Sequence, residues 1–248
     1  MKLLVLGGSS EAGLLARALS TRADLAAILS LAGRTANPAV SPLPTRIGGF
    51  GGVQGLIDFL QAERIDALID ATHPFAARMK RHAAAACAAT KTPLCAFSRA
   101  PWIAKEGDRW TEVEDAAAAV RALDDEPRRV FLAIGRQQAG AFAGPSPHHF
   151  ILRAIDAPSP ESLPASLDLV LARGPFAIED EIALMREKRI DIVVSKNAGG
   201  EATRAKIDAA RALRLPVVMI RRPPAPERPV FETLEGVLGW IEAHRPAP

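Results

Sequence analysis

Several short segments of the chain combine glycine, hydroxyl, histidine and cationic side chains in patterns that suit the binding and protonation of an anionic ligand. They are Gly7-Gly8-Ser9-Ser10-Glu11, Gly48-Gly-Phe-Gly-Gly52, Asp70-Ala-Thr-His-Pro-Phe-Ala76, Ser98-Arg-Ala-Pro-Trp102, Arg173-Gly-Pro-Phe176 and Ser195-Lys-Asn-Ala-Gly-Gly200. Most of them follow a short apolar run of the kind that forms a buried strand. Ligands of open parallel sheets bind beyond the carboxyl ends of the strands, so these segments are the expected site.

The first segment suits a phosphate-binding turn between a strand and a helix. Gly7 and Gly8 let the backbone approach a phosphate without a Cβ in the way, and Ser9 or Ser10 can cap the following helix. N–H groups at a helix start attract anions, so we predict that these residues and Glu11 bind a dinucleotide. The segment is not a full G-x-G-x-x-G pattern, and any tight turn of this kind can use glycine and serine.

The second apolar run ends at Ser30-Leu-Ala-Gly-Arg34, where an NAD-binding chain would carry an acidic residue for the ribose. Ser30 and Arg34 suit a 2′-phosphate instead and predict NADPH, the alternative being that Arg34 is an ordinary solvated loop residue. Gly49, Phe50 and Gly51 are expected to pass close to a flat ring or a phosphate of the cofactor. A sharp connection between a strand and a helix could also need these glycines.

Thr72 and His73 follow a buried strand, and Pro74 keeps His73 extended before the next helix. We expect both side chains near the nicotinamide end of the cofactor, where His73 could supply a proton or bind a carboxylate. The alternative is that His73 is a structural histidine that caps the helix. Lys196 is the other predicted proton donor.

Cationic residues stand at several strand ends, and Pro175 can start a helix after one of them. Each cation alone could be an ordinary surface charge, but several that face one cleft would form a site for a polycarboxylate. The Asn-Ala-Gly-Gly run resembles an anion-binding nest. The predicted substrate-binding residues are Arg99, Arg136, Arg173, Lys196, Asn197, Gly199 and Gly200.

Composition narrows the class of protein. The chain has 248 residues, a formal net charge of +3 and two cysteines, Cys87 and Cys95, which show no zinc or disulfide pattern. The arginines are scattered, which argues against a nucleic-acid-binding arm, and neither a membrane-length apolar run nor a secretory leader is present. We expect a cytoplasmic globular protein without a metal site.

Apolar runs alternate with helical stretches such as 10–20, 53–63 and 77–89, which predicts parallel sheets with helices on both faces. We expect a helix over 113–123 and then a linker at Asp124-Asp-Glu-Pro127. The fold class is therefore α/β, with two Rossmann-like three-layer domains, largely parallel sheets and a cleft between the domains. The predicted domains are 1–125, which binds NADPH, and 126–248, which binds the substrate.

Taken together and in this order, the motifs resemble the precorrin-6A reductase family of cobalamin biosynthesis. The resemblance rests on residues 6–12, 48–52, 70–76, 99–102, 173–176 and 195–200. Asp-Ala-Thr-His-Pro-Phe-Ala and Ser-Lys-Asn-Ala-Gly-Gly are specific to it, whereas the first glycine turn is not. The family more often has serine at the position of Ala198, so this chain lacks one hydroxyl there.

The resemblance implies NADPH-dependent reduction of a carbon–carbon double bond in the precorrin-6A macrocycle, which gives precorrin-6B. The flat substrate, fringed with acetates and propionates, would explain the convergent cations. The alternatives are another NADP-dependent oxidoreductase of an anionic substrate and a non-catalytic tetrapyrrole carrier. We expect a monomer or weak homo-oligomer with no nucleic-acid or membrane partner. The sequence does not distinguish metal-free from cobalt-containing substrate.

Overall fold

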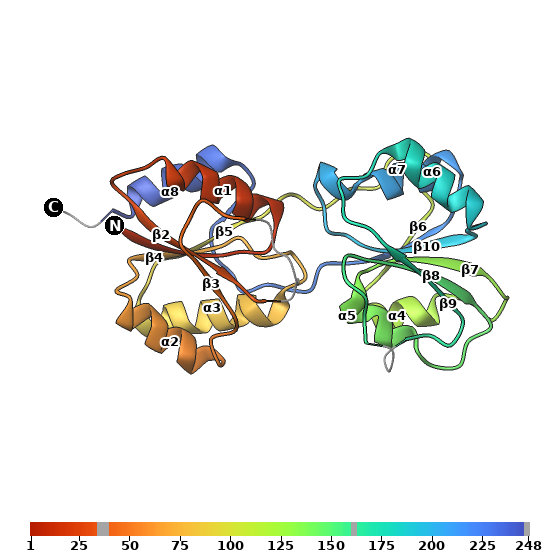
Figure 1. Cartoon of the computed structure of the whole chain (residues 1–248), viewed down its shortest axis with the longest axis horizontal. Coiled ribbons are helices and arrows are strands. Elements are labelled where there is room, and N and C mark those ends of the chain that lie inside the picture. The colour runs from red at the N-terminus through yellow and green to blue at the C-terminus, as the bar shows by residue number, and fades with distance from the viewer. Residues whose placement is uncertain (34–39, 160–162, 246–248) are drawn as a thin grey trace. The chain divides into compact units, whose positions relative to one another are not determined.

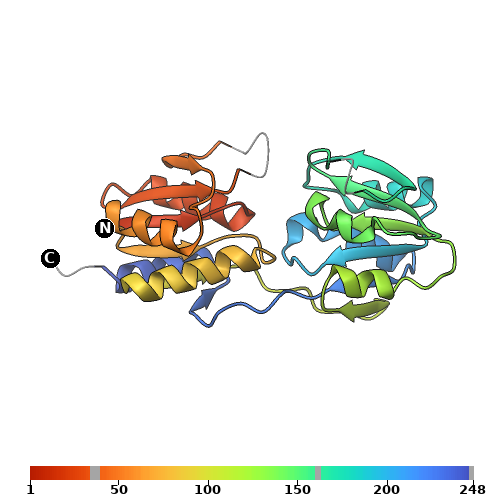
Figure 2. The same cartoon turned by 90° about the horizontal axis from the view of Figure 1, so that it is seen from below.

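The computed structural model describes residues 1–33, 40–159 and 163–245, which form two compact units. The first unit comprises Met1–Ala100 together with Pro224–Pro248, and the second comprises Pro101–Pro223. The chain therefore crosses twice between the units, once after β5 (Leu94–Phe97) and once after β11 (Val217–Ile220) (Figure 2). The boundary predicted at 125/126 is wrong, because a strand before it belongs to the second sheet and the last helix packs on the first.

The first unit contains a six-stranded sheet in which every pair of neighbouring strands is parallel. Its order is β12-β5-β4-β1-β2-β3. The strands are β1 (Lys2–Leu6), β2 (Ala26–Leu31), β3 (Thr45–Ile47), β4 (Ala67–Asp70), β5 (Leu94–Phe97) and β12 (Val230–Phe231). The C-terminal β12 thus completes a sheet that the N-terminal part of the chain begins.

Helices cover both faces of this sheet, with α1 (Ser10–Ser20) and α8 (Leu234–Ala243) on one face (Figure 1). The other face carries α2 (Val53–Ala62) and α3 (Ala77–Thr90). Successive residues of a strand point to opposite faces, so Leu3 packs with α1 and α8 whereas Leu4 packs with α2 and α3. Burial on both faces explains why β1 is a continuous apolar run.

The second unit has a parallel sheet of order β6-β11-β10-β7-β8-β9. The strands are β6 (Trp110–Val113), β7 (Arg129–Ala133), β8 (His149–Ala154), β9 (Leu167–Leu171), β10 (Ile192–Lys196) and β11 (Val217–Ile220). The helices are α4 (Ala116–Arg121), α5 (Arg136–Ala139), α6 (Ile178–Glu187) and α7 (Ala205–Ala212). In Figure 1, α6 and α7 cover one face of this sheet, and α4 and α5 cover the other.

The helix predicted over 113–123 is shorter than expected. Residues 110–113 form β6, which pairs with β11, and α4 begins only after Asp115. The Asp115 side chain accepts a hydrogen bond from the N–H of Ala118 at 2.7 Å, which is a typical N-cap contact. Trp110 and Val113 are partly buried whereas Thr111 and Glu112 are exposed, as suits a short edge strand, so the helix begins later than expected.

The predicted α/β class with two parallel Rossmann-like sheets is confirmed, and the two sheets share one topology. Numbered along the chain, the first unit has the order 3-2-1-4-5-6, and its sixth strand is β12. The second unit repeats this order from β7 to β11, but β6 from the preceding segment takes the sixth position. The strand order reverses between β1 and β4, and again between β7 and β10. These two switch points are where Rossmann-like sheets bind ligands.

Gly55 in α2 leaves room for the backbone of the loop that precedes this helix. A Cβ added at Gly55 would lie 1.7 Å from the Phe50 carbonyl oxygen, which is backbone and cannot move aside alone. We expect Gly55→Ala to lower the free energy of unfolding by about 1–3 kcal/mol, because the loop must shift. Gly239→Ala in α8 is the control, since an added Cβ there meets nothing within 4 Å. Urea denaturation of both variants tests this, and equal stability would contradict it.

Candidate functional site

The turn between β1 and α1 lies at the first switch point. Gly7 donates from its N–H to the Ser30 carbonyl at 2.9 Å, and an added Cβ there would lie 2.6 Å from a Leu29 methyl. Ser9 is the N-cap of α1: its hydroxyl accepts from the Ala12 N–H and donates to the Ala71 carbonyl at 2.7 Å. The turn is therefore fixed between the ends of β2 and β4.

Gly8 leaves the outer side of this turn open. Its φ is +110°, and a Cβ placed on it would meet nothing within 4 Å. A side chain there would be strained, and the space beside the start of α1 stays open. The turn thus has the form of an anion-binding helix start.

Arg99 lies beside this turn, although the sequence suggested that it binds substrate. Its guanidinium donates to the Ser10 hydroxyl and to the Glu11 carboxylate, both at 2.8 Å. The Arg99 and Glu11 side chains are each 15% exposed. Arg99 therefore neutralises a carboxylate that would otherwise oppose an anion at the helix start. The structure therefore brings Arg99, which was predicted to bind the substrate, together with Ser10 and Glu11, which were predicted to bind the cofactor.

Arg46 is a residue of this site that sequence reasoning missed. From the middle of β3 it donates to the Ser30 hydroxyl at 2.9 Å and to the carbonyls of Gly48 and Gly49 at 3.0 Å. Its guanidinium also lies 3.9 Å from the Phe50 ring centroid. An arginine two residues before a glycine-rich loop was the available signal. Burial lowers the Arg46 pKa, while the nearby π-face and carbonyls favour its charged form.

Gly51 and Arg34 were also predicted to bind the cofactor. Gly51 has a φ of +80°, which requires glycine, and it follows Phe50 in the loop that Arg46 holds. Arg34 lies outside the described residues.

A buried charge cluster stands at the end of β4, on the other side of the switch point. Asp70 is fully buried and forms ion pairs with Lys80 at 3.2 Å and with Arg228 at 2.6 Å. Its other oxygen accepts from the Thr72 hydroxyl at 2.6 Å and from the Thr72 N–H at 3.1 Å. The predicted cofactor residue Thr72 is thus held by one carboxylate, which two cations hold in turn. Sequence reasoning did not find Lys80 or Arg228.

His73 directly follows this cluster and is half-buried. Its Nδ1 accepts a hydrogen bond from the Phe75 N–H at 3.2 Å, within the same loop. Because Nδ1 is an acceptor, the neutral ring carries its proton on Nε2. His73 therefore has one ring nitrogen committed to the loop backbone, and its other nitrogen can carry a proton.

In the second unit, two predicted cations occupy the equivalent switch point. Arg136 begins α5 after β7, and Lys196 ends the neighbouring strand β10. Arg136 lies 4.0 Å from Asp156, a weak and partly exposed pair. Burial lowers the pKa of Lys196 to about 8. Arg173 is exposed and follows β9, two strands from β7, so it lies farther along the same sheet edge.

Asn197 and Gly200 make structural contacts with Trp102. The Asn197 side chain accepts from the Trp102 N–H at 2.8 Å and donates to the Trp102 carbonyl at 2.9 Å. The Trp102 indole N–H donates to the Gly200 carbonyl at 3.0 Å. Gly199 and Gly200 have φ values of +68° and +74°, as a turn of this kind needs. The amide of Asn197 is therefore largely used within the protein.

A second buried ion pair supports the loop that carries Arg173. Arg153 on β8 pairs with Glu181 on α6, with side chains 9% and 2% exposed. The Arg153 guanidinium also lies 3.9 Å from the ring centroid of Phe176, which ends the Arg-Gly-Pro-Phe segment. Sequence reasoning did not find Arg153. This pair fixes the base of the loop.

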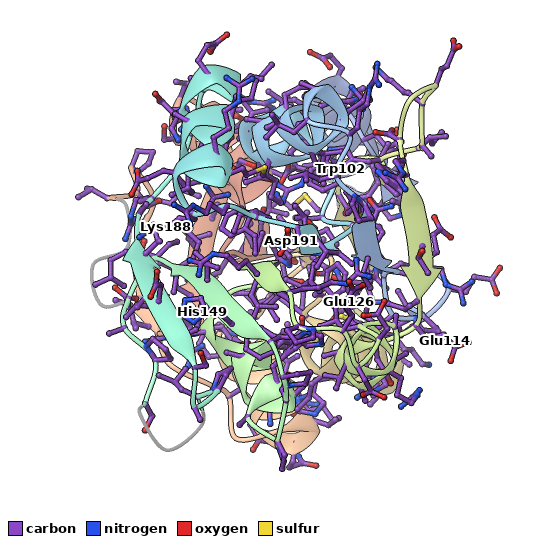
Figure 3. All side chains as sticks on the ribbon, turned by 90° about the vertical axis from the view of Figure 1, so that its right-hand side faces the viewer. Trp102, Glu114, Glu126, His149, Lys188 and Asp191 are labelled. Atoms are coloured by element: carbon purple, nitrogen blue, oxygen red, sulfur yellow. The ribbon has the colours of Figure 1, made fainter. Side chains whose placement is uncertain are left out.

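A further group of charged side chains lies near the amino-terminal ends of strands in the second sheet, away from their carboxyl ends. His149 begins β8, and its Nε2 lies 3.2 Å from Asp168, which also pairs with Lys188 at 3.4 Å. Figure 3 labels His149 and Lys188 in this unit. Across the described part of the chain, no group of three or more histidine, cysteine or acidic side chains is placed to hold a metal ion. The same residues include no helix that is long and apolar enough to span a membrane.

Comparison with known proteins identifies the family. The model of "Precorrin-6x reductase CbiJ/CobK" matches residues 2–242. The chain belongs to the precorrin-6x reductase family. This reductase is 53% identical to a precorrin-6A reductase from Rhodobacter capsulatus over 248 residues, 100% of this chain and 98% of the relative. A solved structure titled CobK precorrin-6A reductase superposes with a TM-score of 0.94 at 52% identity, covering 100% of this chain and 98% of the other.

More distant relatives of this reductase carry a different name. A cobalt-precorrin-6A reductase from Priestia megaterium is 26% identical over 197 residues, which is 75% of this chain and 76% of the relative. As a member of the family, this chain is an oxidoreductase of cobalamin biosynthesis that acts on a CH–CH group. A reduction of this kind needs a nicotinamide cofactor.

Proposed function

We propose that this reductase uses NADPH to reduce one carbon–carbon double bond of precorrin-6A and so forms precorrin-6B. The observation that carries the proposal is the family match over nearly the whole chain. The clustering of unusual side chains at the two switch points supports it, because each sheet then offers a ligand site at its carboxyl edge.

The first unit fits a dinucleotide. The open turn at Gly7 and Gly8 and the capped start of α1 suit the pyrophosphate, and Thr72 and His73 stand across the switch point. When bound, NADPH supplies the hydride for the reduction. The protein contributes binding, orientation and a proton.

Arg46 and Ser30 support a preference for NADPH over NADH. They are paired on the neighbouring strands β2 and β3, and the described residues after β2, from Ala32 to Gly33, include no acidic side chain for a ribose 2′-hydroxyl. The contacts of Arg46 use three of the five N–H groups of its guanidinium. Its fixed plane on Phe50 is pre-organised to meet a 2′-phosphate.

We expect Arg46→Ala to raise the KM for NADPH by about 10–100-fold, the effect of losing one or two charge-assisted hydrogen bonds. The KM for NADH should change much less, because NADH lacks the phosphate. Steady-state kinetics with both cofactors tests this, with Arg17→Ala on the exposed side of α1 as the control. Equal effects on the two cofactors would assign Arg46 to loop structure alone.

The second unit supplies cations for the carboxylates of the tetrapyrrole. Arg136 and Lys196 come from adjacent strand ends, and Arg173 extends the positive edge of the sheet. Gly199 and Gly200 shape the turn after Lys196. Lys196 and His73 are the proposed proton donors, because each can present a protonated nitrogen from a switch point.

The metal-free macrocycle is the proposed substrate, because the relatives named for it share far more residues with this chain than the relative named for the cobalt form. An anaerobic assay that follows NADPH absorbance with each form of precorrin-6A tests this. Rapid oxidation with the metal-free form supports the proposal. Oxidation only with another substrate would indicate a different reductase, and tight binding of the tetrapyrrole without oxidation would indicate a carrier.

A further inference from the structure

The segment that leads from the second unit back to the first is rich in proline and has an arginine near each end. Residues 221–229 read Arg-Arg-Pro-Pro-Ala-Pro-Glu-Arg-Pro. Proline fixes φ and favours extended backbone, so such a segment is stiffer than an ordinary linker. Its two anchoring arginines contact different units: Arg222 contacts the second, and Arg228 contacts the first.

Arg222 binds the loop that follows Lys196. Its Nε donates to the Asn197 carbonyl at 3.0 Å, and a terminal nitrogen donates to the Ala198 carbonyl at 2.9 Å. The planar guanidinium therefore holds two consecutive peptide groups directly after Lys196. Lysine, with a single ammonium centre, does not reproduce this paired geometry.

Arg228 binds the carboxylate beneath the loop that carries His73. It donates to Asp70 at 2.6 Å and to the Pro226 carbonyl at 2.9 Å, and its side chain is 5% exposed. Asp70 in turn accepts both hydrogen bonds from Thr72. A displacement of Arg228 would thus move the Asp70 carboxylate, and Asp70 would in turn move Thr72 and the adjacent His73.

We propose that Arg222 and Arg228 are positioning residues for the reduction: Arg222 holds the loop that directly follows Lys196, Arg228 supports the loop that carries His73, and each keeps its proton donor in the reactive conformation. The proposal rests on the proposed function of these two residues. Both arginines come from one stiff connection, so the chain carries the supports for both loops in a single short segment. A small misplacement of reacting groups can lower a rate by about a hundredfold.

The test compares Arg222→Ala and Arg228→Ala with Arg221→Ala in the full-length enzyme. Arg221 is the matched control, because it precedes Arg222 but is 53% exposed and makes only a 3.5 Å contact with Glu114. Both test variants should fold: Asp70 keeps Lys80 after the loss of Arg228, and water can replace Arg222 at the carbonyls. Steady-state kinetics and hydrogen exchange are measured on each variant.

We expect kcat to fall about 10–100-fold in each test variant, with a smaller change in the KM for NADPH. Exchange should become about tenfold faster at 197–200 in Arg222→Ala and at 71–76 in Arg228→Ala, and each variant should leave the other loop unchanged. Arg228→Lys should retain most activity because it keeps the charge next to Asp70. Arg222→Lys should not, and added guanidinium ion should partly restore Arg222→Ala.

Several results would overturn the proposal. Faster exchange without loss of kcat would show that the loops need no such support for the reaction. Loss of kcat without faster exchange, or equal loss in Arg221→Ala, would show that the arginines act in another way. If the unmodified enzyme did not oxidise NADPH with precorrin-6A, the proposed function would fail and the catalytic role with it, even where the exchange data still showed both loops anchored.

Discussion

Replacing Lys196 by methionine is expected to lower kcat by about 10²–10⁴-fold, the usual contribution of a positioned acid. Methionine preserves much of the side-chain length and suits the burial of this residue, so the fold should be retained. Lys105→Met is the control, because Lys105 is an exposed lysine of the same unit. Anaerobic kinetics with NADPH and precorrin-6A provide the measurement. Turnover within a few-fold of the unmodified enzyme would remove Lys196 from the reaction.

The pH profile separates two roles of Lys196. Burial lowers its pKa to about 8, so its ammonium form is lost as the pH rises through that value. Activity that needs the ammonium, as acid or as carboxylate ligand, should therefore decline above about pH 8. In Lys196→Arg the charge persists at all accessible pH values. An active Lys196→Arg enzyme without this decline would indicate carboxylate binding, whereas an inactive one would indicate proton donation.

The parallel strands could be predicted from the sequence because their signal is local. A strand buried on both faces is a continuous apolar run, as Lys2–Leu6 and Ile192–Lys196 largely are. The edge strand β6 gives no such apolar run, because only part of its surface is buried. The alanines after Asp115 indicated a helix over this region instead. Because β6 was not recognised, the predicted domain boundary was placed after this strand and not before it. Nothing local shows that β12 and α8 return to the first sheet.

The chemistry-bearing segments could also be found, but not the contacts within them. Asp70 and Arg228 are 158 positions apart, and Trp102 and Asn197 are 95 apart, so no spacing rule connects them. One physical signal was available: a carboxylate at the end of a fully buried strand needs a cationic partner. Lys80 and Arg228 meet that need. Asn197 was assigned to the substrate because the run that it begins resembles an anion-binding nest, although its amide binds the Trp102 backbone.

Replacing Asp70 by leucine is expected to lower the free energy of unfolding by about 3–5 kcal/mol, the cost of breaking a buried ion pair from one side. Lys80 and Arg228 would be left as buried cations, with side chains 4% and 5% exposed. The control is Asp124→Leu, which breaks an exposed pair with Arg128 and should change stability by no more than about 1 kcal/mol. Urea denaturation followed by circular dichroism measures both. Similar values for the two variants would contradict the buried cluster.

A triple variant, Asp70→Leu with Lys80→Met and Arg228→Met, distinguishes stability from positioning. Apolar residues of similar volume often replace a buried ionic group at little cost, so this variant should recover most of the stability lost in Asp70→Leu. Thr72 would still lack its acceptor, because leucine cannot bind its hydroxyl or N–H. We therefore expect a folded enzyme with low kcat. Recovery of activity together with stability would show that Asp70 serves the fold alone.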